Sequence, residues 1–208
     1  MIKPRIDTRL LTLGAMSALS YEMLLKIGIA ISPSLFRSAP IAALTSVLSF
    51  CAGLIIILFL WALARETDAR TRLRLMLYLL AASMVLAAAF RMWAATVPSD
   101  FRHVRIVQHV TSVVQAALIL LCAIGYRWQI PPEFGPLARA ANLLIGLFSA
   151  SFVMSVLSLT AYAQFLATGI AAEPGPQFGR LVFALFMFTH GALLLFLYRY
   201  LQSKRAGR

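Results

Sequence analysis

Residues 41–64, IAALTSVLSFCAGLIIILFLWALA, form an uninterrupted apolar run that contains no charged side chain. The run is long enough to cross the hydrocarbon core of a bilayer, which takes about 20 residues of helix. Within that core every backbone N–H and C=O must be paired, and the run lacks the alternation of a barrel strand. The stretch therefore predicts a transmembrane α-helix.

Five other segments of similar length and composition surround this one, although Glu22 and Lys26 interrupt the first of them. Together the segments predict an all-α, polytopic transmembrane helix bundle of about six spans. They leave no stretch long enough for a soluble catalytic or DNA-binding domain, so a single integral membrane domain over residues 1–208 is expected. The expected spans are approximately 10–31, 41–64, 74–97, 104–126, 138–168 and 179–200.

The composition supports a lipid environment, because 61% of the 208 residues are hydrophobic and only 12% are charged. A soluble domain carries about 25% charged residues. The net charge of +12 could also indicate nucleic-acid binding, but the sequence contains no nucleic-acid-binding module. Basic residues that flank membrane spans explain the charge, so the expected partner is the bilayer and not nucleic acid.

The positions of the basic residues predict an orientation. With six spans, 13 of the 19 Lys and Arg residues lie on the side of the chain termini, and four lie on the other side. Positive charge concentrates in cytoplasmic loops, so both termini are expected in the cytoplasm of a bacterial-type inner membrane. The 13 are Lys3, Arg5, Arg9, Arg65, Arg70, Arg72, Arg74, Arg127, Arg139, Arg199, Lys204, Arg205 and Arg208, and the four are Arg37, Arg102, Arg105 and Arg180.

The span at 104–126 carries a polar face. Arg105, Gln108, His109 and Gln115 recur with helical spacing and enter from the outer end of the span. Lipid does not favour glutamine at that depth, so these side chains face other helices. They either form interhelical hydrogen bonds or line the wall of a cavity that opens outward.

Other polar or charged residues, which are energetically unfavourable in lipid, lie in the same outward half of the membrane. Arg91 either snorkels to the interface or, because it shares a stripe with small residues, faces a neighbouring helix. His190 lies near the middle of its span and needs a partner, which Glu22 could supply. Glu22 and Lys26 could also pair with each other at i, i+4. The candidate ligand pocket comprises Glu22, Lys26, Arg91, Arg105, Gln108, His109, Gln115 and His190.

Two further patterns are interpreted structurally. Ser151, Ser155 and Ser158 form one stripe on the span at 138–168, which indicates close helix packing. Cys51 and Cys122 lie in apolar runs without metal-ligand spacing, so neither a disulfide nor a metal site is expected.

The favoured function is that of a ligand-sensing protein or an accessory subunit of a membrane complex. Its outward-facing cationic pocket would take an anionic or amphipathic small ligand, and a membrane-protein partner is possible. No paired acidic residues and no nucleophile–base pair are evident, so no catalytic residue is predicted.

Two alternatives remain open. Small residues Gly14, Ala15 and Ala18 in TRLLTLGAMSALS, together with the six-span architecture, resemble the S components of energy-coupling-factor transporters. That resemblance implies a substrate-binding subunit of a transporter. The second alternative is a b-type haem protein with His109 and His190 as axial ligands, although the two histidines lie at different depths in their spans.

The predicted orientation can be tested with fusions at Arg208. We expect activity from a reporter that works only in the cytoplasm and none from one that works only in the periplasm, because the 13-to-4 charge bias favours an inward C-terminus. Activity of the periplasmic reporter alone would contradict this topology.

Overall fold

The computed structural model describes residues 8–36, 38–67, 71–94, 102–131, 133–169 and 176–206. These residues form six long helices and one short one, and they include no strand. The six long helices are long and apolar enough to cross a membrane. The expected all-α membrane bundle is thereby confirmed. The helices are α1 (Thr8–Ile31), α2 (Pro33–Phe36), α3 (Ala39–Glu66), α4 (Arg72–Ala94), α5 (Arg102–Arg127), α6 (Gly135–Thr168) and α7 (Pro176–Ala206).

Each predicted span coincides with one long helix, and the helix boundaries follow local chemistry. Pro40 and Pro136 lie in the first turns of α3 and α6, where a missing N–H removes no helical hydrogen bond. Gly169 ends α6 with φ of 70°, and its N–H donates to the Phe165 carbonyl oxygen at 2.8 Å. Residues 95–97, at the end of the third predicted span, lie outside the described residues.

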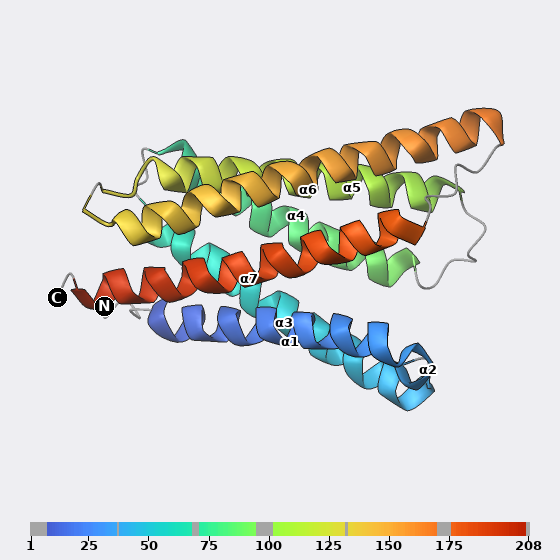
Figure 1. Cartoon of the computed structure of the whole chain (residues 1–208), viewed down its shortest axis with the longest axis horizontal. Helices are drawn as coiled ribbons and strands as arrows, with labels where there is room; N and C mark the ends of the chain where they lie inside the picture. The colour runs from blue at the N-terminus through green and yellow to red at the C-terminus, as the bar shows by residue number, and fades with distance from the viewer. Residues whose placement is uncertain are drawn as a thin grey trace.

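The six long helices form a closed ring. The backbones of neighbouring helices lie side by side in the order α1, α3, α4, α5, α6 and α7, and α7 returns to α1. Figure 1 shows that α1 begins and α7 ends at one end of the bundle, which we call the terminus end. The opposite end, where α2 connects α1 to α3, is called the distal end.

The connection at α2 is tight. A Cβ atom on Gly28 would lie 2.7 Å from the Phe36 ring, closer than real side-chain contacts allow. Glycine at position 28 therefore lets α2 fold back against α1.

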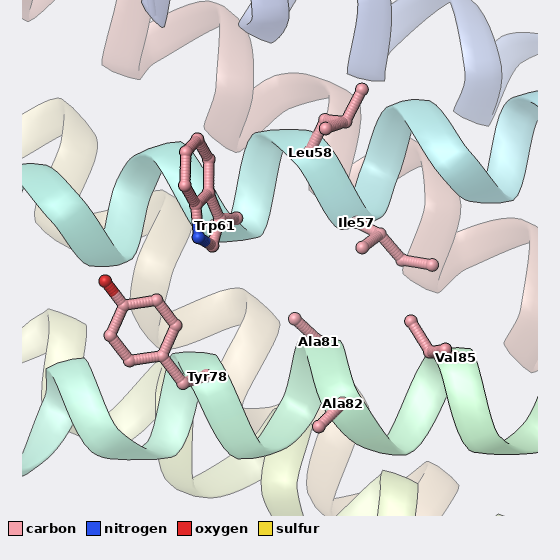
Figure 2. A pocket seen from close by; sticks show the side chains of 7 residues that line it. All are labelled: Ile57, Leu58, Trp61, Tyr78, Ala81, Ala82 and Val85. Atoms are coloured by element: carbon pink, nitrogen blue, oxygen red, sulfur yellow. The ribbon is translucent and has the colours of Figure 1, made fainter.

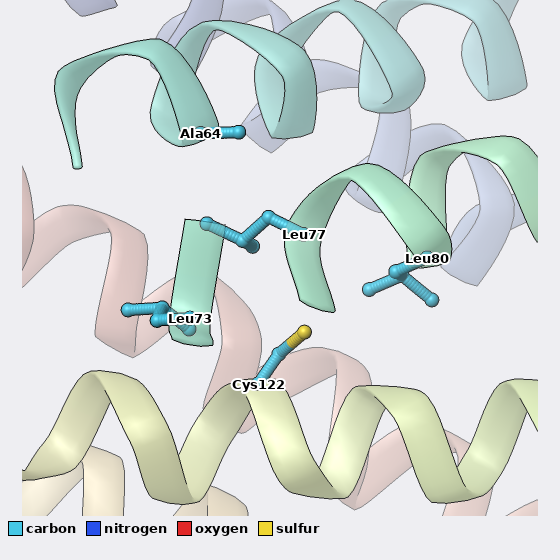
Figure 3. Close-up of a cluster of buried hydrophobic side chains, with 5 residues drawn as sticks. All are labelled: Ala64, Leu73, Leu77, Leu80 and Cys122. Atoms are coloured by element: carbon cyan, nitrogen blue, oxygen red, sulfur yellow. The ribbon is translucent and has the colours of Figure 1, made fainter. Parts of the chain in front are cut away.

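The buried core concentrates toward the terminus end. One cluster, formed by Ala64, Leu73, Leu77, Leu80 and Cys122, joins α3, α4 and α5 (Figure 3). Within the described residues, α5 buries no side chain before Cys122, and α6 buries none after Phe148. Packing is thus dense at the terminus end and sparse at the distal end of these two helices.

A small central cavity lies within this packed region. Its volume is about 120 Å³, and apolar side chains from α3, α4, α5, α6 and α7 line it. Examples from the last three helices are Cys122, Leu144 and Leu193. These residues identify the face of each helix that points into the ring.

A polar junction at Glu66 joins three helices at the terminus end. The Glu66 carboxylate accepts hydrogen bonds from Thr8 Oγ1 at 2.7 Å and from the Tyr200 hydroxyl at 3.1 Å. It also forms an ion pair with Lys204, with Nζ to Oε2 at 2.7 Å. In addition, Arg9 donates to the Lys204 carbonyl oxygen at 3.1 Å. These bonds connect the start of α1, the end of α3 and the end of α7.

The two cysteines are free, as predicted. Cys51 is exposed on α3, whereas Cys122 is buried in the core on α5.

The Glu66 junction predicts a stability effect. Glu66→Ala removes the acceptor for three donors, and we expect it to lower the free energy of unfolding by about 1–3 kcal/mol, since the site is partly exposed. Glu66→Gln keeps an acceptor for Thr8 but loses the charge, and should have an intermediate effect. Thermal unfolding in detergent measures both.

The matched control is Glu133→Ala, which removes an exposed carboxylate at the same end of the bundle. It should leave the unfolding temperature nearly unchanged. Equal losses at positions 66 and 133 would show that the junction contributes no specific stabilisation.

Candidate functional site

The inner face of α5 changes character along the helix. Ile119 and Cys122 line the central cavity, and residues spaced three or four apart continue the same face toward the distal end. These residues are Gln115, Ser112, Gln108 and Arg105. Gln115 is half-buried, whereas the other three are exposed. The face that is apolar and covered near the termini is therefore polar and uncovered at the distal end.

The inner face of α1 shows the same change. Ala15, Ala18 and Leu19 are buried on the side that packs against α3 and α7. One turn further, on the same face, Glu22 is half-buried, and Lys26 another turn on is exposed. Two helices from opposite sides of the ring thus present charged or polar groups at the distal end.

His190 lies in the middle of the candidate span of α7, residues 177–204. Its Nδ1 lies 3.0 Å from the Phe186 carbonyl oxygen, which can only accept a hydrogen bond. Nδ1 therefore carries a hydrogen, and in the neutral ring Nε2 is an acceptor. Glu22 and Lys26 on α1 both lie within electrostatic range of this ring. Glu22 and Lys26 make no ion pair with each other among the described side chains.

His109 belongs to a different contact, between α5 and α6. Its Nδ1 lies 3.3 Å from the Ser158 hydroxyl oxygen, and its ring lies 5.0 Å from the Tyr162 ring, tilted by 34°. The other two serines of the stripe, Ser151 and Ser155, instead donate to carbonyl oxygens of their own helix. The spacing of the serines in the sequence predicts that they share one helix face. It does not predict that His109 contacts Ser158.

Gln115 makes an interhelical hydrogen bond. Its Nε2 donates to the Ser83 carbonyl oxygen of α4 at 3.1 Å. Gln115 therefore forms an interhelical hydrogen bond, which is one of the two roles expected for the polar face. Its position is nevertheless on the inner face of α5.

The predicted pocket residues therefore do not meet in one cluster. His109 contacts Ser158 and Tyr162 where α5 meets α6, whereas His190 on α7 lies within electrostatic range of Glu22 and Lys26 on α1. Arg91 belongs to α4, but its side chain lies outside the described residues. No group of three or more His, Cys, Asp or Glu side chains that could hold a metal ion occurs among the residues described.

Comparison of the chain with protein-family models, with curated proteins and with solved structures finds no match. Inference about function therefore depends on the geometry of the bundle.

The two histidine contacts predict different energetic coupling. His109→Ala and Ser158→Ala should be non-additive, with a coupling of about 0.5–1.5 kcal/mol, because each removes the partner of the other. His109→Ala and His190→Ala should add within about 0.5 kcal/mol, because the residues lie at separate helix contacts. Double-mutant cycles from thermal unfolding in nanodiscs measure both quantities. Strong coupling between the histidines, with none between His109 and Ser158, would contradict the structural assignment.

Proposed function

We propose that this chain is a small inner-membrane protein that binds an anionic or amphipathic ligand in a polar pocket at its distal end. It would act as a ligand sensor or as an accessory subunit of a membrane complex. In this proposal the termini are cytoplasmic, in keeping with the charge bias, and the distal end faces outward.

One observation carries the proposal: the inner faces of α1 and α5 are buried and apolar at the terminus end but polar and uncovered at the distal end. Polar side chains that pointed into lipid would be strongly disfavoured. Arg105, Gln108 and Ser112 are exposed on a face that continues into the central cavity, and in this proposal they line an opening of the ring.

The charges in this opening favour an anionic group. Arg105 and Lys26 are exposed on the distal halves of their helices, and Glu22 is the single carboxylate that the described residues place in the distal half of the bundle. Arginine binds carboxylate and phosphate through planar, paired hydrogen bonds. Deeper in the ring the cavity of about 120 Å³ is lined by apolar side chains. A ligand with an anionic head and an apolar tail matches this order of environments.

The solvent accessibility of the proposed opening can be tested by thiol labelling. In a background with Cys51 and Cys122 replaced by Ala, we expect Ser112→Cys to react with a membrane-impermeant thiol reagent added from outside. The matched control is Val110→Cys, which is also exposed and at similar depth, but lies on the opposite face of α5. It should stay unreactive in lipid. Equal labelling at both positions, or at neither, would contradict an outward-facing polar pocket.

Ligand chemistry can be tested in the same variant. Laurate, an anionic amphiphile, should slow labelling at Ser112→Cys, whereas dodecanol, which has the same chain and no charge, should have a weaker effect. Adding Arg105→Gln and Lys26→Gln should abolish the difference between the two. Equal protection by both amphiphiles would show that the pocket does not select an anionic group.

A further inference from the structure

A groove lies on the outer surface of the ring, between α3 and α4. Its volume is about 430 Å³. Trp61 on α3 faces Tyr78 on α4 at one end of the groove, and Val85 lies at the other end (Figure 2). Ala81 and Ala82 line the stretch between them, and their short side chains leave the hollow between the two helices.

The groove faces away from the interior of the ring. On α3 its wall includes Leu58 and Trp61, both exposed, whereas Phe59 and Leu63 line the central cavity. On α4, Ala82 is exposed in the groove, whereas Leu77 and Leu80 point inward. In a membrane, this outer surface is in contact with lipid.

Two arginines lie at the terminus end of the groove. The Arg65 guanidinium carbon lies 4.6 Å from the Trp61 ring centre, and that of Arg74 lies 5.8 Å from the Tyr78 ring centre. Stacking over an aromatic ring holds a guanidinium in a defined orientation and leaves its N–H donors available at the edge. Each arginine is thus positioned over an aromatic side chain that forms the groove.

The depth of these groups matches the layers of a membrane leaflet. Arg65 and Arg74 lie within two residues of the ends of α3 and α4. Trp61 and Tyr78 lie about 6 Å further in than these arginines, and Val85 lies about 16 Å further in than Arg74, at 1.5 Å per residue. Cations therefore occupy the headgroup level, aromatic rings lie just below it, and small apolar side chains extend into the hydrocarbon layer.

We propose that this groove binds an anionic phospholipid of the leaflet at the terminus end, with its phosphate at Arg65 and Arg74 and an acyl chain along Ala81, Ala82 and Val85. Charge complementarity favours this occupant. The groove has cations at one end only and apolar side chains along the rest, which matches a molecule with one charged end.

The first test uses the unaltered full-length protein in mixed micelles that contain equal amounts of phosphatidylglycerol and phosphatidylcholine. Native mass spectrometry should show bound phosphatidylglycerol in excess over phosphatidylcholine by roughly five- to thirtyfold, since each basic residue near a membrane surface favours anionic lipid several-fold. Phosphatidylglycerol with a photoreactive group in its acyl chain should label residues of α3 and α4 that line the groove. Labelling mainly elsewhere, or equal binding of the two lipids, would overturn the proposal.

Variants separate the two parts of the site. Arg65→Gln with Arg74→Gln should reduce the preference for phosphatidylglycerol to about twofold or less, because neutral side chains give no electrostatic advantage. The control, Arg72→Gln, removes an exposed arginine from the same turn of α4 and should retain the preference. Loss of the preference in the control alone, or in both to the same extent, would show that general surface charge selects the lipid.

The acyl-chain part is tested by filling the groove. Ala82→Phe should displace the photolabel from α3 and α4, whereas Leu79→Phe, at an exposed position of α4 outside the groove, should not. Circular dichroism and size-exclusion chromatography establish that each variant is folded. If Ala82→Phe does not fold, the labelled positions in the unaltered protein decide the result. A dimer cross-linked through Ala82→Cys in the membrane would identify a second copy as the occupant and refute the proposal.

Discussion

The requirement that backbone polar groups be paired inside lipid determines most of this structure. Each long apolar run satisfies the requirement by itself as a helix, so its backbone needs no hydrogen bond from a neighbouring helix. Neighbouring helices then differ only in which side chains they present. Dense packing of small and apolar residues such as Ala64 and Leu77 closes the ring at the terminus end. At the distal end, polar residues take the place of such side chains.

An exposed side chain in such a protein faces either the interior of the ring or the surrounding lipid. The face of the helix on which it lies decides which. Ser112 and Val110 are both exposed on α5, yet one lies on the face of the central cavity and the other on the opposite face. The same distinction separates the proposed polar opening inside the ring from the apolar groove between α3 and α4 outside it. The opening lies inside the ring at the distal end, whereas the groove lies on the outer surface with its charged end at the terminus end, so the proposed ligand and lipid would not compete for one space.

The sequence predicted what depends on local composition. The spans follow from hydrophobic length, and the polar face of α5 follows from residue spacing. Pairings between distant segments could not be predicted, because the order of helices around the ring is not encoded in any one segment. Glu66 and Lys204 are 138 residues apart, and no pattern near Glu66 indicates its partner. For the same reason, the sequence placed His109 and His190 in one cluster, whereas the ring assigns them to separate contacts.

The dense packing of α6 at the terminus end, through Leu137, Ala141 and Leu144, has a mechanical consequence. A helix that is densely packed at one end and sparsely packed at the other behaves as a lever with its pivot at the packed end. The 34 residues of α6 give it a length of about 51 Å at 1.5 Å per residue. A tilt of a few degrees at its base therefore displaces its distal tip by several ångströms while contacts near the pivot barely change. Motion at the distal end can in this way occur without repacking at the terminus end.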